Sequence, residues 1–214
     1  ADCGCGHHKE KEFNRFYVGA GGGYSIPLKK SFNEGTAKFN LKKSEMYTGL
    51  IGYKITEDIF FELSYDHKDS YGLRIEIPQV DTSKTKAKSS VYMANVVYHL
   101  QDFNSFRPYF VVGAGFSDIK IKPISAQAKG YPITAYSVMP HTSRNFTWQL
   151  GLGVSKPVTD NLSLDLSARM HVAHNLKLKY RALNAATGQY YNGSIKKTLG
   201  VGEIIAGFTY DLPF

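Results

Sequence analysis

The sequence has no apolar run that approaches the roughly 18 residues of a membrane-spanning helix. Its mean hydropathy is only -0.28. This shortage argues against membrane helices and would place the chain among water-soluble proteins in a hydropathy scan. It does not exclude the membrane, because the strands of a transmembrane barrel alternate apolar and polar residues, which average out in such a scan.

Cysteine is scarce as well, with only Cys3 and Cys5, and a bridge between them would close a small, strained ring. Together with His7 and His8 they are ligand types for a metal, but their spacing is too tight for a structural zinc site. We interpret residues 1–12 as a flexible periplasmic N-terminal tail, with a metal site in this tail as the alternative. The opening Ala1, without a Met or an apolar leader, indicates a mature chain whose signal peptide has been removed.

Alternation of apolar and polar residues is the strongest signal present, in a chain with 20 Gly, 15 Tyr and 13 Phe. Such period-two patterns, rich in aromatic residues, are typical of strands. Eight segments show it: 16–26, 47–55, 59–66, 92–100, 110–116, 146–155, 162–172 and 204–212. Each has one apolar face and one face of polar residues or glycine, which predicts an all-β fold of eight antiparallel strands.

The connections between these segments alternate in length. Short connections lie at 56–58, 102–105 and 157–161, and long ones at 28–45, 67–90, 118–144 and 176–197. This order predicts an up-and-down transmembrane barrel over residues 13–214. Four long extracellular loops would lie at one end, and three short periplasmic turns with both termini at the other.

A soluble sandwich or a lipocalin-like barrel would also alternate. Three features favour the membrane barrel, one of which is the terminal Phe214. Aromatic residues cluster near the ends of the segments, as interface girdles require. The polar face carries too many charges for an apolar ligand cavity. The charged set is Glu62, Asp66, Asp165, Arg169 and Glu203.

Three parts of the chain resemble OmpA/OmpX-like outer-membrane barrels: residues 16–24, residues 107–116, and residues 148–154 with the following 159–165. The final alternation to Phe214 resembles the signal read by the barrel-assembly machinery, with Pro213 as a departure from it. The resemblance implies a monomer in the bacterial outer membrane, without a cofactor. The Lys-rich loops and the layout are also similar to rickettsial surface antigens of the Adr adhesin type. That would imply host attachment, capture of vitronectin and serum resistance.

Positive charge gathers in the long connections, which carry most of the 26 basic residues, and the fourth has five basic residues and no acid. Such a surface suits an acidic protein segment, a sulfated glycan or lipopolysaccharide phosphates. The alternative is a solvated rim that holds anionic outer-leaflet lipid, and nucleic acid is not expected at a cell surface. The predicted partner-binding residues are Lys120, Lys122, Lys129, Tyr131, Tyr136, Arg144, Lys177, Lys179, Tyr180, Arg181, Lys196 and Lys197.

The five inward charges predict a salt-bridged plug, because opposite charges buried in a narrow lumen should pair. A conducting pore is the alternative. Ser167 and His171 also face inward but lie roughly 13 Å apart along a strand. That is too far for a nucleophile–base hydrogen bond, so we expect no enzyme; no metal site is predicted either. The alternatives to an adhesin are a barrel that only stabilises the outer membrane and a lipid-A-modifying enzyme. Gly19, Gly21 and Gly23 are expected to make lumen space.

Overall fold

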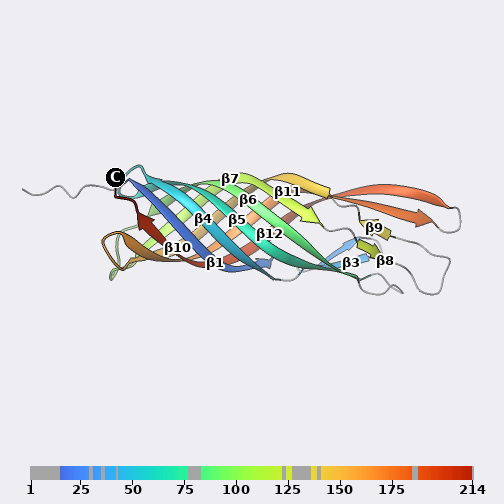
Figure 1. Ribbon diagram of the computed structural model, residues 1–214, viewed down its shortest axis with the longest axis horizontal. Helices are drawn as coiled ribbons and strands as arrows, with labels where there is room; N and C mark the ends of the chain where they lie inside the picture. Colours follow the sequence, from blue (N-terminus) through green and yellow to red (C-terminus); the bar gives the residue numbers. More distant parts are fainter. Residues whose placement is uncertain are drawn as a thin grey trace, which may run out of the picture.

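The protein is a closed antiparallel β-barrel, shown here by a computed structural model (Figure 1). The structure describes residues 15–28, 31–34, 37–41, 43–76, 83–121, 124–126, 136–138, 141–184 and 188–213. The barrel strands are β1 (Phe16–Pro27), β4 (Ser44–Lys54), β5 (Ile59–Glu76), β6 (Ser83–His99), β7 (Arg107–Ile121), β10 (His141–Pro157), β11 (Leu162–Asn184) and β12 (Gln189–Asp211). Short strands are β2 (Ser31–Glu34), β3 (Ala37–Leu41), β8 (Ile124–Ala126) and β9 (Tyr136–Val138).

Pairing of the first strand with the last closes the sheet. β1 pairs with β12 on one side, with Ala20 opposite Phe208, and with β4 on the other. Every barrel strand is antiparallel to its two neighbours, and the β10–β11 pairing completes the circle. In the part of the chain that the structure describes, no helix has the length and hydropathy needed to span a membrane.

All eight predicted strands are present, but the predicted connections at the loop end are too long. β5 extends to Glu76, and β6 begins at Ser83. Likewise, β11 extends to Asn184, and β12 begins at Gln189. Much of the loops predicted at 67–90 and 176–197 is therefore strand. The predicted strands end where their apolar face ends. Backbone hydrogen bonds between two strands, however, also form outside the membrane, so the hairpins continue beyond the apolar part. Figure 1 shows β11 and β12 running past the other strands, away from the C-terminus.

The outer wall of the barrel is apolar, which confirms the predicted orientation of the alternating faces. A row of aromatic residues crosses four strands, with Tyr65 opposite Tyr92, Tyr92 opposite Phe116, and Phe116 opposite Phe146. All four side chains are exposed. Neighbours in this row pack at ring distances of 5.1 Å (Tyr65–Tyr92) and 6.5 Å (Phe116–Phe146). Such a belt suits a membrane interface, where the aromatic ring is half apolar and half polar.

The predicted tail (1–12), with Cys3, Cys5, His7 and His8, and the terminal Phe214 lie outside the described residues.

The glycines on the inner wall do more than make lumen space. A Cβ added at Gly23 would overlap the backbone oxygen of Ile204, so here glycine permits close approach of β12 to β1. At Gly52, an added Cβ would overlap the ring of Tyr17, which is buried and donates a hydrogen bond to Glu62 at 2.8 Å. Gly52, which was not among the glycines predicted to make lumen space, leaves room for the Tyr17 ring. At Gly23, which was, the constraint is the neighbouring backbone.

We expect Gly52→Val to lower the free energy of unfolding by about 1–3 kcal/mol, the usual cost of overpacking. Gly49→Val on the same strand is the matched control, because a Cβ there meets nothing within 4 Å. Urea unfolding in detergent, followed by fluorescence of the single tryptophan, measures the difference. Equal stability of the two variants would contradict the close fit between Gly52 and the Tyr17 ring.

Candidate functional site

Two groups of side chains stand out, one inside the barrel and one at its loop end. The five predicted lumen residues all face inward, on β5 (Glu62, Asp66), β11 (Asp165, Arg169) and β12 (Glu203). Asp165 is half-buried and accepts a hydrogen bond from the Thr209 hydroxyl at 3.1 Å. The other four are buried, so the structure brings together four carboxylates around one predicted cation.

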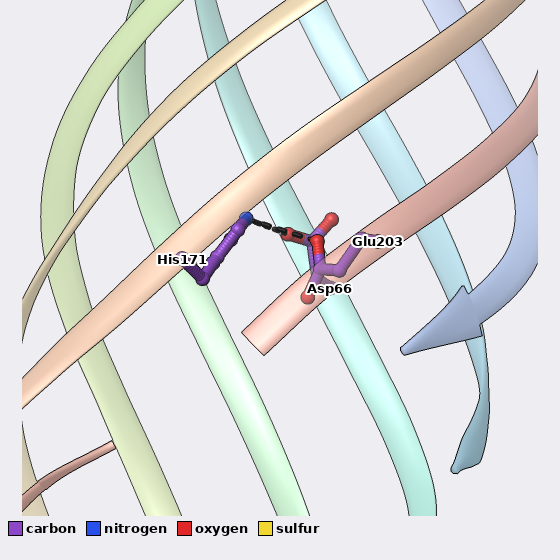
Figure 2. A group of neighbouring side chains, drawn as sticks. All are labelled: Asp66, His171 and Glu203. Atoms are coloured by element: carbon purple, nitrogen blue, oxygen red, sulfur yellow. Dashed lines mark ion pairs between the residues drawn. The ribbon is translucent and has the colours of Figure 1, made fainter. Parts of the chain in front are cut away.

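Two further residues of this group, Lys68 and His171, were not among the predicted lumen charges. The Lys68 ammonium makes an ion pair with the Glu203 carboxylate, and both side chains are almost completely buried. His171 Nε2 lies 3.0 Å from Glu203 Oε2 and 4.0 Å from Asp66 Oδ2. Figure 2 shows these three side chains pointing toward one another from three strands. We call Asp66, Lys68, His171 and Glu203 the lumen cluster.

Sequence reasoning missed Lys68 because the predicted third strand ended at Asp66 and the next connection was read as a loop. Alternation continued for two more residues would have placed Lys68 on the inner face with Asp66. His171 was recognised as inward-facing but was tested only as a base for Ser167. In the folded barrel it meets carboxylates from β5 and β12, two strands that are not neighbours in the sheet.

A second set of polar contacts in the lumen links side chains of β10, β6 and β5. The Gln149 amide donates to Asn95 Oδ1, and the Asn95 amide donates to the Ser64 hydroxyl at 3.1 Å. Asn95 and Gln149 are fully buried. These three side chains thus fill part of the lumen and hydrogen-bond to one another, as a narrow eight-stranded barrel allows.

At the loop end, β11 and β12 form a hairpin with most of its basic residues on one face. A β-bulge between Ala173 and Leu176 shifts the register. Beyond it, Lys177 lies opposite Lys196, Lys179 opposite Ser194, and Arg181 opposite Asn192. Residues directly opposite each other and alternate residues of one strand share a face. Four basic positions therefore share one face of the hairpin, which we call the cationic face: Lys177, Lys179, Arg181 and Lys196.

The other face of the hairpin carries mainly apolar positions, including Leu176, Leu178 and Ile195. The cationic face continues the outer wall, because steps of two along β12 lead from the exposed Ile204 to Lys196, which is also exposed. Like charges directly opposite each other, as at Lys177 and Lys196, are unfavourable in a sheet. An anion bound across this pair would remove that repulsion.

The remaining predicted partner-binding residues are placed as follows. Lys120 on β7 is exposed, and Tyr136 on β9 lies opposite Ala182, which joins the third connection to the hairpin. Tyr180 occupies β11 and Lys197 occupies β12, on the face opposite the cationic one. Outside the described residues are Lys122, Lys129 and Tyr131.

Arg144 already has a partner within the chain. Its Nε and Nη2 atoms donate to the two carboxylate oxygens of Asp118 at 3.1 and 3.3 Å. This hydrogen bonding raises the pKa of Arg144 above its ordinary value. Because the pair is neutral overall, Arg144 contributes less to a cationic surface than the hairpin residues do.

Comparisons with known proteins identify a family and a relative. A family model for the outer membrane protein beta-barrel domain matches residues 3–202. An uncharacterized protein of Rickettsia prowazekii (strain Madrid E) is 36% identical over 183 residues, covering 79% of this chain and 100% of the relative. The predicted resemblance to outer-membrane barrels is thereby confirmed.

Solved structures with the same fold include two outer-membrane proteins. OprG from Pseudomonas aeruginosa has a TM-score of 0.60 at 10% identity, over 93% of this chain and 97% of that chain. Ail, the attachment invasion locus protein of Yersinia pestis, has a TM-score of 0.51 at 14% identity, over 92% of this chain and 99% of that chain. That Ail structure is a complex with the heparin analogue sucrose octasulfate. At these identities the likeness concerns the fold.

Proposed function

Because the chain belongs to the outer membrane protein beta-barrel family and lies in the bacterial outer membrane, we propose that it is a non-enzymatic surface adhesin. In this proposal the loop end faces the outside of the cell and the termini face the periplasm. The partner is an anionic host macromolecule, held by the basic residues of the β11–β12 hairpin. The protein acts as a monomer, and the barrel-assembly machinery reads its C-terminal Phe214.

The cationic face is the observation that carries this proposal. It gathers four basic positions on one side of a hairpin that has no acidic residue between 176 and 197. Charges of one sign on a projecting element raise the local concentration of an oppositely charged partner and speed its encounter. Tyr136 and Tyr180, which were also predicted to bind the partner, occupy positions on the opposite face of the hairpin and have no part in this proposal.

Sulfate groups and acidic protein segments both fit such a surface. The complex of Ail with a heparin analogue supports the first kind of ligand in a protein of the same fold. By its resemblance to rickettsial adhesins, the proposed protein partner is vitronectin, a serum protein that restrains complement killing. Capture of vitronectin would then give host attachment and serum resistance.

A second candidate follows from the position of the cationic face on the outer side of the hairpin. This face continues the lipid-facing wall. The two positions nearest the barrel, Lys177 and Lys196, could therefore bind phosphates of lipopolysaccharide. The protein would then stabilise the outer membrane without a host ligand. The lipid-A-modifying alternative receives less support, because Ser167 and His171 are buried in the lumen, away from lipid.

Salt dependence tests the proposal. The refolded full chain in detergent should bind immobilised heparin and purified vitronectin at low salt. Affinity should fall by about tenfold or more between roughly 50 and 300 mM NaCl, because screening shortens the range of exposed charges. Binding that high salt leaves unchanged would contradict an electrostatic adhesin. Binding to lipopolysaccharide alone, with no retention of heparin or vitronectin, would favour the structural candidate.

A further inference from the structure

We propose that Asp66, His171 and Glu203 form a binding site for a divalent transition-metal ion of the zinc type inside the barrel. This site is separate from the proposed adhesive surface and does not depend on it. The sequence analysis predicted no metal site, and these three residues lie on three strands without a common motif spacing. Only closure of the sheet brings them together.

The geometry of the three side chains is close to that of a metal centre. One imidazole nitrogen and one oxygen from each carboxylate all lie within 4.8 Å of one another. His171 Nε2 is 3.0 Å from Glu203 Oε2 and 4.0 Å from Asp66 Oδ2. Ligands about 2.0–2.2 Å from a tetrahedral zinc ion lie roughly 3.3–3.6 Å apart. Shifts of about an ångström or less in these side chains would therefore complete three sides of the site (Figure 2).

Asp66 supplies an independent indication of a missing partner. Its side chain is 0% exposed, and within the described residues neither of its carboxylate oxygens accepts a hydrogen bond. A buried carboxylate without hydrogen bonds is expensive. A metal ion between Asp66 and Glu203 would satisfy it, since carboxylate oxygens are among the common ligands of zinc.

The charge of the lumen points the same way. Among the described residues, Lys68 and Arg169 stand against four carboxylates in the middle of the barrel: Glu62, Asp66, Asp165 and Glu203. Lys54 and Asp211 pair with each other at 2.5 Å toward the turn end and leave this balance unchanged. The lumen therefore has a formal excess of two negative charges when His171 is neutral. One divalent cation would cancel it.

Lys68 is compatible with a metal because of which oxygen it uses. Its ammonium contacts Glu203 Oε1, while Oε2 faces His171. Glu203 can thus give one oxygen to the metal and keep the other on Lys68, in the way that ligating carboxylates are held by outer-shell partners. A cavity of about 20 Å³, lined in part by Lys68 and His171, lies on the loop side of the cluster. This is room for one water molecule as a further ligand.

The ligand set selects among metals. Imidazole favours zinc and its first-row neighbours, whereas calcium and magnesium prefer oxygen alone. A bound ion would tie β5 to β11 and β12 across the lumen, because these residues lie on opposite parts of the sheet. The expected consequence is a stiffer and more stable loop half of the barrel.

The test uses the full chain with the tail ligands removed by Cys3→Ser, Cys5→Ser, His7→Ser and His8→Ser, so that the tail cannot bind the metal. The barrel is folded in detergent and stripped with chelator, then titrated with Zn²⁺ against a chromophoric chelator. We expect about one Zn²⁺ per chain. The unfolding midpoint should rise by about 5 °C or more at saturation.

His171→Gln should weaken Zn²⁺ binding at least about tenfold and abolish the rise in the unfolding midpoint. His99→Gln is the matched control, because His99 is also buried in the lumen but packs between Phe60 and Tyr109, apart from the cluster. Co²⁺ added to the tail-substituted chain gives a second readout that needs no change in the cluster. Its visible absorption should show nitrogen and oxygen ligation.

Three results would overturn the proposal. They are no Zn²⁺ bound by the tail-substituted chain, equal binding by His171→Gln and His99→Gln, or the same stabilisation by Ca²⁺ as by Zn²⁺. In the first case protons rather than a metal would balance the lumen charge. If His171→Gln does not fold, Asp66→Asn replaces it and should show the same loss of binding.

Discussion

Lys68→Met should lower the free energy of unfolding by about 3–5 kcal/mol, the usual cost of removing one partner of a buried ion pair. The ammonium of Lys68 is buried with the Glu203 carboxylate. Its removal adds one more uncompensated negative charge to a lumen in which carboxylates already outnumber cations. Urea unfolding of the full chain in detergent with chelator present, so that no metal contributes, measures this loss.

Two variants show whether charge is the cause. The double variant Lys68→Met with Glu203→Met removes both partners and should recover most of the lost stability, because it restores the charge balance of the native lumen. Lys88→Met is the surface control. Lys88 pairs with Asp69 at 3.0 Å but is half exposed, and its loss should cost less than about 1 kcal/mol. A double variant no more stable than Lys68→Met would show that packing, rather than charge, explains the effect.

Neutralising the cationic face should remove most of the proposed adhesion. Replacing all four residues, Lys177, Lys179, Arg181 and Lys196, by glutamine should weaken heparin and vitronectin binding on the order of 10- to 100-fold, because exposed ion pairs contribute up to about 1 kcal/mol each. Affinity in the variant should also depend less on salt. The matched control replaces Lys29, Lys30, Lys42 and Lys43, which changes the net charge equally but outside the hairpin.

A finer comparison separates position from charge. Lys196 and Lys197 are adjacent in the chain, yet the register places them on opposite faces of the hairpin. Lys196→Gln should weaken binding more than Lys197→Gln does, although both remove one positive charge. Equal effects of the two single changes, or of the two four-residue variants, would mean that net charge alone attracts the partner and that the cationic face has no special role.

The two groups of residues place different demands on the barrel. The lumen cluster is buried, where charges interact strongly and an unmatched one is costly. On the cationic face, Lys196 is exposed, and an exposed charge contributes little to stability and is weakened by salt. We therefore expect changes in the cluster to alter unfolding with little effect on ligand binding, and changes in the cationic face to do the reverse.

The number of barrel strands, their approximate positions and their two faces follow from the sequence alone. Period-two alternation around residues such as Tyr92, Ala94 and Val96 is a local property, because successive side chains of a strand always point to opposite sides. The length of the hairpins could not be read in the same way. Beyond the apolar belt the pattern fades, while backbone pairing continues to Glu76 and Asn184.

The lumen charges show the same division. Alternation identified Glu62, Asp66, Asp165, Arg169 and Glu203 as inward-facing, and the structure agrees. Which charges meet was decided by register: His171 reaches Glu203 between the paired strands β11 and β12, and Lys68 reaches it across the lumen of the closed barrel. Lys68 and Glu203 are more than a hundred positions apart and come into contact only when β1 pairs with β12. The register of that pairing cannot be predicted from the local sequence.

The cationic face was likewise only half visible in the sequence. Composition determined that residues 176–197 carry five basic residues and no acid. The β-bulge after Ala173 decided that four of the basic positions share a face, because one extra residue reverses the side to which every later residue of β11 points. Local patterns thus determine the wall of the barrel, while register, a property of paired strands, determines which residues meet in its interior and which share the cationic face.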